Sequence, residues 1–111
     1  MITLHGIANC DTVKKARTAL PDAAFRDFKK QAPSGAELAR WADAVGWEAL
    51  LNRKGTTFRA LSEADRAGLD RDRALALMEA QPSLIKRPVI DDGATVTVGW
   101  TPEARAAWGA A

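Results

Sequence analysis

The sequence predicts an α/β (α+β) protein built on a mixed four-stranded sheet, with a block of helices inserted between its two halves. A strand, a helix and a second strand fit within residues 1–30, and so short a unit implies parallel strands joined by a right-handed crossover. Residues 31–84 carry helical patterns, and residues 85–111 predict two strands joined by a turn and then a helix.

The first half contains a strand, a helix and a strand in that order. Residues 2–6 are rich in β-forming side chains and predict a strand. Residues 9–12 (Asn-Cys-Asp-Thr) are typical of a helix start, because Asn and Asp cap well and an acid in the first turn suits the helix dipole. Apolar residues then recur at helical spacing up to Pro21, which ends the helix, and residues 24–28 alternate as a second strand does.

The middle block begins with a clear capping pattern. Ser34, followed three residues later by Glu37, forms a capping box, and Gly46 ends the helix that it starts. After this helix the sequence predicts a further helical stretch, a polar loop and two more helices, in the order 47–51, 53–57, 62–68 and 70–81.

The last part predicts a hairpin and a helix. Two β-rich runs, 88–90 and 95–99, flank residues 91–93 (Asp-Asp-Gly), and an Asp-Gly turn between such runs is a strong hairpin signal. Residues 101–103 (Thr-Pro-Glu) combine a cap, a proline at the first helical position and an acid, so we expect a final helix that includes Trp108.

Without the middle block, the order of these elements is that of a thioredoxin-like fold. We therefore expect residues 1–111 to form a single thioredoxin-like domain. In that domain, residues 1–30 form the βαβ half, 31–84 the helical insertion and 85–111 the ββα half.

Composition narrows the class of function. The chain is 47% hydrophobic and 27% charged, as an ordinary globular protein is, and its net charge of +2 is too small to indicate a nucleic-acid or membrane surface. One cysteine cannot form an internal disulfide, and one Cys with one His cannot build a structural zinc site. No signal-peptide pattern or membrane-spanning run is visible. We expect a cytoplasmic monomer with no metal and no bound cofactor.

Cys10 is the first candidate for chemistry, because it stands where a predicted strand meets a helix start. N–H groups there stabilise a thiolate, which is the reactive form of the thiol. Lys14 and Lys15 lie one turn further on and would add to the same field, and Thr12 would face the sulfur with its hydroxyl or its N–H. The alternatives are an inert buried cysteine and an ordinary first-turn threonine. Since there is no Cys-x-x-Cys pair, a disulfide formed in turnover must involve another molecule, glutathione being the natural small candidate.

Two arginines are candidates for anion binding. Arg87 precedes Pro88 at the start of the third predicted strand, and Arg53 opens the polar loop. A guanidinium binds carboxylates and oxyanions in a two-pronged way, although either arginine alone also fits a solvated surface residue. Lys86 is a weaker candidate of the same kind. His5 is expected to be structural rather than a partner of the thiol, and the four tryptophans are expected in the core: Trp41, Trp47, Trp100 and Trp108.

Three separated blocks resemble the arsenate reductase (ArsC)/Spx family, and most closely its YffB-like branch. They are ITLHGIANCDTVKKAR at 2–17, GWEALLNRKGTT at 46–57 and IKRPV at 85–89, so the resemblance covers nearly the whole chain. It implies a thioredoxin-like domain with an inserted helical block and Cys10 as the nucleophile. It further implies that Arg53 and Arg87 hold an oxyanion near that cysteine, and that Pro88 is a cis-proline beside the active site.

The chain also departs from parts of the family pattern. Gly6 stands where arsenate reductases carry a histidine, no basic residue occurs near Gly99 where a third family arginine falls, and Val13 replaces the second cysteine of Spx-type switches. These departures speak against arsenate as the substrate, and the resemblance to the YffB-like branch implies a glutathione-dependent thiol reductase that works through a mixed disulfide. Its substrate would be a small-molecule or protein disulfide, and glutathione or a glutaredoxin would resolve the intermediate. The alternatives are an Spx-like regulator that binds a partner such as RNA polymerase without catalysis, and a genuine arsenate reductase.

Overall fold

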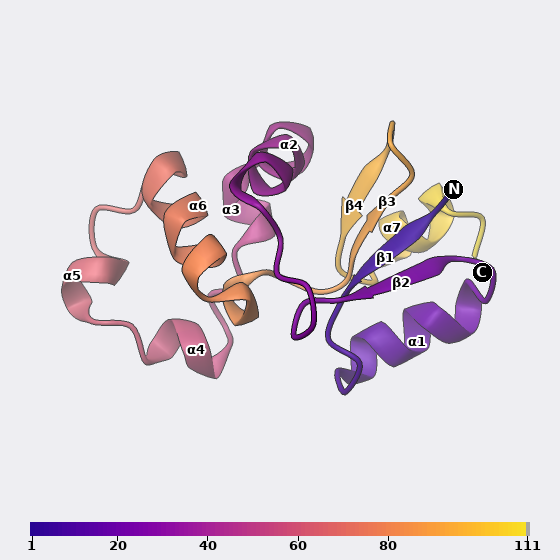
Figure 1. Ribbon diagram of the computed structural model, residues 1–111, viewed down its shortest axis with the longest axis horizontal. Coiled ribbons are helices and arrows are strands. Elements are labelled where there is room, and N and C mark those ends of the chain that lie inside the picture. The colour runs from indigo at the N-terminus through magenta and orange to yellow at the C-terminus, as the bar shows by residue number, and fades with distance from the viewer. Residues whose placement is uncertain (111) are drawn as a thin grey trace. The chain divides into compact units, whose positions relative to one another are not determined.

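The computed structural model describes residues 1–110 and divides the chain into two compact units (Figure 1). The sheet unit consists of residues 1–32 together with the chain from Arg87 onward, and the helical unit consists of Pro33–Lys86. The helical unit lies where the sequence predicts an inserted block over residues 31–84. Within residues 1–110, no helix is both long enough and apolar enough to cross a membrane.

The sheet unit contains a four-stranded mixed sheet, which confirms the predicted fold class. Its strands lie in the order β2-β1-β3-β4. β1 is parallel to β2 and antiparallel to β3, and β3 is antiparallel to β4. The bounds are β1 Thr3–Gly6, β2 Ala24–Asp27, β3 Val89–Asp91 and β4 Val96–Val98.

One face of this sheet is covered by α1 (Asp11–Ala19) and α7 (Pro102–Ala107). Leu4 pairs with Ile90 in the strand register, and both are fully buried in one cluster with Ala16 of α1. Trp108, which follows α7, packs against the same cluster and donates an N–H to the Thr97 hydroxyl at 2.7 Å. Because α1 and α7 meet one cluster, the α1 start is held against the sheet.

The helical unit packs α2 against α3 and α6 around a buried core. The capping box that the sequence predicts is present, with the Glu37 N–H bonded to the Ser34 hydroxyl at 3.1 Å and the Ser34 N–H bonded to the Glu37 carboxylate at 3.0 Å. The bounds are α2 Gly35–Val45, α3 Trp47–Leu50, α4 Thr56–Arg59, α5 Glu63–Arg66, α6 Arg71–Ala80 and a 3₁₀ turn, η1, Pro82–Leu84.

Two local expectations need correction. The polar loop expected over residues 53–57 ends at Gly55, because α4 begins at Thr56; a single turn of helix is too short to show a periodic apolar pattern. Among the tryptophans, Trp41 is fully buried, whereas the other three are only partly buried. Trp100 and Trp108 nevertheless pack against the buried cluster of the sheet unit.

Candidate functional site

Cys10 is the N-cap residue of α1, in extended conformation. Its N–H donates to the Ile7 carbonyl at 3.1 Å and its carbonyl accepts from the Lys14 N–H at 2.9 Å, so the chain turns directly from β1 into the helix. The side chain of an N-cap residue faces the N–H groups two and three positions later, here those of Thr12 and Val13. No hydrogen bond from these N–H groups caps the helix through the Cys10 side chain, and such donors at a helix start favour a negative charge beside them.

The pKa of Cys10 lies below the ordinary value for a thiol. Burial raises this pKa, but the N–H of Val13, a hydrogen bond from the Arg87 guanidinium, the N–H of Thr12 and the charge of Arg87 together outweigh that effect. The residue is partly exposed, so a reagent can reach the sulfur. A larger share of the thiolate at neutral pH makes Cys10 a stronger nucleophile than a free cysteine at the same pH.

The strand order explains how Arg87 reaches Cys10. β3 runs antiparallel to β1 with Val89 opposite His5, so the segment that leads into β3 lies beside the end of β1 from which Cys10 follows. The Arg87–Pro88 peptide bond is cis, the isomer that the resemblance implies for this proline. Pro88 is buried, and its carbonyl accepts the Gly99 N–H at 2.9 Å, which ties this segment to the chain after β4.

His5 takes part in a packed cluster rather than in a pair with the thiol. Its side chain is 7% exposed. Its Nδ1 lies 3.2 Å from a guanidinium nitrogen of Arg26, and its ring stacks on Phe28 with centroids 6.4 Å apart. These contacts agree with the structural role that the sequence predicts.

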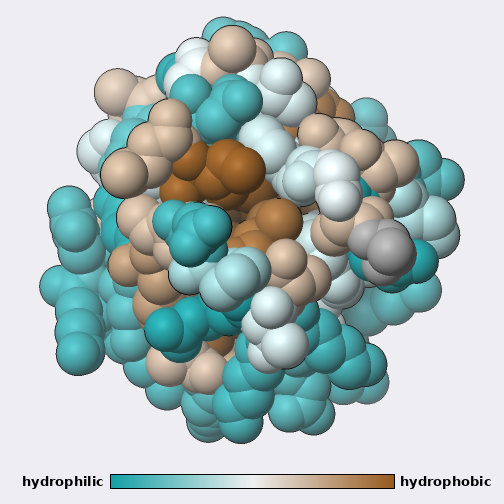
Figure 2. All heavy atoms as spheres, turned by 90° about the vertical axis from the view of Figure 1, so that its right-hand side faces the viewer, coloured by the Kyte–Doolittle hydropathy of each residue, from teal (hydrophilic) through white to brown (hydrophobic). Residues whose placement is uncertain are grey.

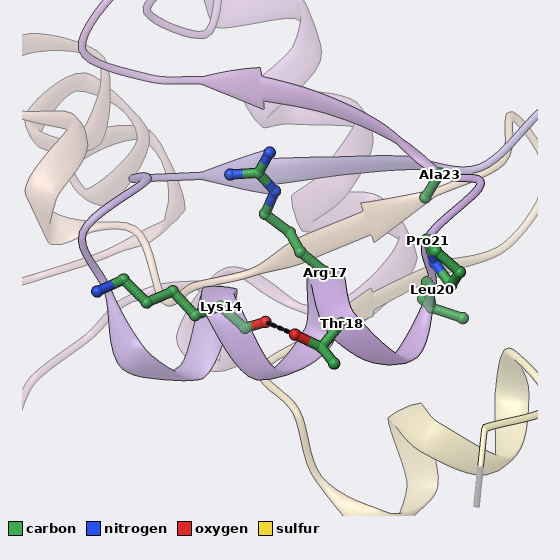
Figure 3. A pocket seen from close by; sticks show the side chains of 6 residues that line it. All are labelled: Lys14, Arg17, Thr18, Leu20, Pro21 and Ala23. Atoms are coloured by element: carbon green, nitrogen blue, oxygen red, sulfur yellow. Dashed lines mark hydrogen bonds between the residues drawn. The ribbon is translucent and has the colours of Figure 1, made fainter.

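Lys14 lies outside the set of groups that act on Cys10. It is exposed and lines a shallow hollow with Arg17 and Thr18, whose hydroxyl donates to the Lys14 carbonyl at 3.0 Å (Figure 3). Neither Lys14 nor Lys15 is among the main causes of the lowered pKa of Cys10. The field at the sulfur therefore comes from Arg87 and the helix start.

Arg53 and Lys86 belong to the helical unit. Arg53 is exposed, with its guanidinium carbon 5.9 Å from the centroid of the Trp47 ring, a cation–π distance. The Lys86 side chain is exposed, while its N–H donates to the Leu50 carbonyl at 2.8 Å. The part of either residue in chemistry at Cys10 stays a prediction.

A second hollow of the sheet unit adjoins the first and shares Leu20, Pro21 and Ala23 with it. Its lining includes Ile2, Leu20, Ala23 and Trp108, and apolar side chains gather there on the surface (Figure 2). Neither this hollow nor the one that Lys14 lines includes Cys10.

The importance of the Val13 N–H was not predicted, because the apolar spacing of the helix indicates only a core residue at that position. The hydrogen bond from this N–H is the largest single contribution that lowers the pKa of Cys10. The signal was present in the sequence, because placing the N-cap at Cys10 makes Val13 the third helical residue and its N–H a donor to the cap side chain.

Known proteins resemble this chain over nearly its whole length. The ArsC family model matches residues 5–108. An uncharacterised protein of Haemophilus influenzae is 36% identical over 104 residues, covering 90% of this chain and 91% of that protein. The solved structure of a YffB protein is 48% identical, with a TM-score of 0.91 over 96% of this chain and 97% of its own. An arsenate reductase (ArsC) related protein from Brucella melitensis is 45% identical, with a TM-score of 0.76 over 97% and 93% of the two chains.

Proposed function

Because this chain belongs to the ArsC family, we propose that it is a glutathione-dependent thiol reductase with Cys10 as its nucleophile. The observation that carries the proposal is the environment of that sulfur. The N–H groups of Val13 and Thr12 and the guanidinium of Arg87 favour its anionic form, and the residue is partly exposed. A stabilised, accessible thiolate is what attack on a disulfide requires.

The reaction has two exchange steps. The Cys10 thiolate attacks one sulfur of a mixed disulfide between glutathione and a substrate thiol; a bond forms between Cys10 and the glutathione sulfur, and the substrate leaves as a thiolate that takes a proton. A second glutathione thiolate then attacks the Cys10 adduct, releasing oxidised glutathione and the free Cys10 thiolate. In net, the mixed disulfide and one glutathione thiol become the substrate thiol and oxidised glutathione, so the substrate sulfur is reduced as the sulfur of the incoming glutathione is oxidised. A glutaredoxin thiol would serve equally in the second step.

Arg87 has two roles in this proposal. It stabilises the Cys10 thiolate between turnovers, and the same cation stabilises the thiolate that leaves when Cys10 is released from its adduct. Arg53 is included because of the family resemblance, as a second guanidinium for a carboxylate of glutathione. Such a reductase belongs in the cytoplasm, where glutathione keeps thiols reduced.

The test is reduction of a glutathionylated peptide, followed as oxidised glutathione appears. We expect Cys10→Ser to abolish turnover, because a hydroxyl cannot form the mixed disulfide. The control variant is Thr18→Ala, an exposed residue of the same helix that lies outside the Cys10 contacts, and it should keep full activity. Full activity in Cys10→Ser would refute the proposal.

Arsenate reduction is the second candidate, favoured by Arg87 beside the thiol, because a guanidinium binds oxyanions. An arsenate reductase should show arsenate protecting Cys10 from alkylation, which the disulfide mechanism does not require. Protection by arsenate, together with no turnover of the glutathionylated peptide, would replace our proposal with this one. A third outcome would favour the Spx-like regulator instead. In that case neither the glutathionylated peptide nor arsenate is reduced, and the chain captures a protein partner equally well with and without Cys10→Ser.

A further inference from the structure

Gly6 is the last residue of β1 and is buried. Its backbone does not need a glycine, because positive φ angles occur at five other glycines and not here: Gly46, Gly68, Gly93, Gly99 and Gly109. What Gly6 provides is space. A Cβ at this position would lie 2.8 Å from Cγ2 of Val13 and 3.6 Å from its Cγ1, and the first of these distances is well inside ordinary carbon–carbon contact.

The crowding that a side chain at Gly6 would cause could not be absorbed on the strand side. The Gly6 carbonyl accepts the Phe28 N–H at 2.8 Å, which ties the end of β1 to the chain that leaves β2. On the other side, Val13 is 0% exposed, so its side chain has no solvent into which to move. The displacement would fall on the first turn of α1, to which Val13 belongs.

This turn is the one that acts on Cys10. Val13 therefore has two contacts that matter, its side chain against Gly6 and its N–H toward the sulfur. If a side chain at position 6 crowds Val13, the Val13 backbone shifts by a few tenths of an ångström. That shift moves the Val13 N–H relative to the Cys10 sulfur. Arg87 is the charged side chain that acts most strongly on the same sulfur, and it approaches from the segment before β3, which the substitution at Gly6 leaves in place.

We propose that Gly6 is a positioning residue: the side chain that it lacks lets Val13 pack against the end of β1 and so holds the first-turn N–H groups of α1 at the Cys10 sulfur. This deepens the proposed function and rests on it, since it concerns the same nucleophile. It states in addition that the packing between Gly6 and Val13 sets the reactivity of that nucleophile.

The experiment measures the rate of Cys10 alkylation by iodoacetamide against pH in the full chain. The midpoint is the pH at which alkylation reaches half of its maximal rate. We expect Gly6→Ala to move this midpoint upward by about half a pH unit to one pH unit, which corresponds to roughly threefold to tenfold slower alkylation at a pH below the midpoints of both proteins. Val13→Ala keeps the backbone N–H and should leave the midpoint near that of the parent protein. The double variant, Gly6→Ala with Val13→Ala, removes the crowded atoms and should return the midpoint to the value for Val13→Ala alone.

Gly35→Ala is the matched control. Gly35 also has no positive φ, and a Cβ there would meet only the end of the flexible Glu79 side chain, at 3.1 Å, in the helical unit. Its midpoint should equal that of the parent. A purely structural role for Gly6 would lower the melting temperature without moving the midpoint, and that result overturns the proposal.

The remaining outcomes also decide the matter. If Gly6→Ala does not fold, the double variant decides. A folded double variant with the midpoint of Val13→Ala supports the proposal. A double variant that is unfolded, or whose midpoint is raised, overturns it. Failure of the proposed function looks different, because the parent protein itself would then alkylate with the profile of a free cysteine. A reactive parent whose midpoint is unaffected by Gly6→Ala contradicts only the inference about Gly6.

Discussion

The reactivity of Cys10 results from opposing local effects on one sulfur. Burial favours the neutral thiol, and two backbone N–H groups with one guanidinium favour the thiolate. The N–H groups belong to the helix start and are present in any sequence that places the N-cap at Cys10. Of the groups that lower the pKa of Cys10, only Arg87 acts through its side chain, so a substitution can remove its effect.

Replacing Arg87 with alanine should raise the pKa of Cys10, because the thiolate then loses both a hydrogen bond and a neighbouring positive charge. We expect about tenfold slower alkylation at a pH below the midpoint of the rate–pH profile. The alkylation rate against pH measures it. Lys14→Ala is the control and should leave the profile unchanged; equal shifts in the two variants would contradict the assignment of the local field to Arg87.

Arg53 should behave differently from Arg87 if its role is to bind glutathione. Removing its side chain should raise the KM for glutathione severalfold, as loss of one exposed charge-assisted contact does, without moving the alkylation profile of Cys10. Steady-state kinetics with varied glutathione provide the measurement. An unchanged KM in Arg53→Ala, with Arg59→Ala as a control for loss of positive charge, would remove Arg53 from the site.

Among the elements, the β3–β4 hairpin depends on its turn residues. The Asp92 carboxylate accepts the N–H of Thr95 at 2.7 Å and that of Ala94 at 2.9 Å, and Gly93 adopts the positive φ of 94° that the turn requires. The same two N–H groups lower the pKa of Asp92. An aspartate followed by glycine therefore both signals the turn in the sequence and holds it in the structure.

Asp92→Ala should lower the melting temperature at neutral pH, since two backbone donors lose their acceptor. A carboxylate whose pKa is lower in the folded state stabilises the fold above its unfolded pKa, and this contribution is lost as the pH falls through the folded pKa. The difference between Asp92→Ala and the parent should therefore shrink on acidification. Thermal unfolding followed by circular dichroism at neutral and acidic pH measures it, and a difference that does not depend on pH would contradict the role of the charged form.

For the molecule as a whole, the lowered pKa of Cys10 links stability to pH in the alkaline range. The folded state holds the thiolate more readily than the unfolded chain does, so the contribution is absent below the folded pKa and fully present above the unfolded pKa. The parent protein should gain stability over Cys10→Ser as the pH rises between those two values. Urea unfolding of both proteins under reducing conditions tests this, and a stability difference that stays constant across that range would contradict it.

The starts and turns of the helices and strands follow from patterns that are local in the sequence. The Ser34–Glu37 capping box and the Asp-Gly turn each involve neighbouring residues, and both form as expected. The first helix also begins within residues 9–12, but its N-cap is Cys10 rather than an Asn or Asp, and no side-chain hydrogen bond caps it. Short elements were harder to predict. The single-turn helix α4 has too few residues for its pattern to differ from that of a loop, and its first residues were assigned to the loop before it.

The sequence by itself determined that Cys10 stands at the start of the first helix, close to the N–H groups of its first turn, because a helix start is signalled by residues within one turn. Only the tertiary structure decided which cation reaches the Cys10 sulfur. Lys14 is near Cys10 along the chain but is not among the main causes of its lowered pKa, whereas Arg87 is distant along the chain and arrives because β3 pairs with β1. The close approach of Gly6 and Val13 is likewise a matter of packing, since the atoms of a strand and a helix meet only once the helix has folded back onto the sheet.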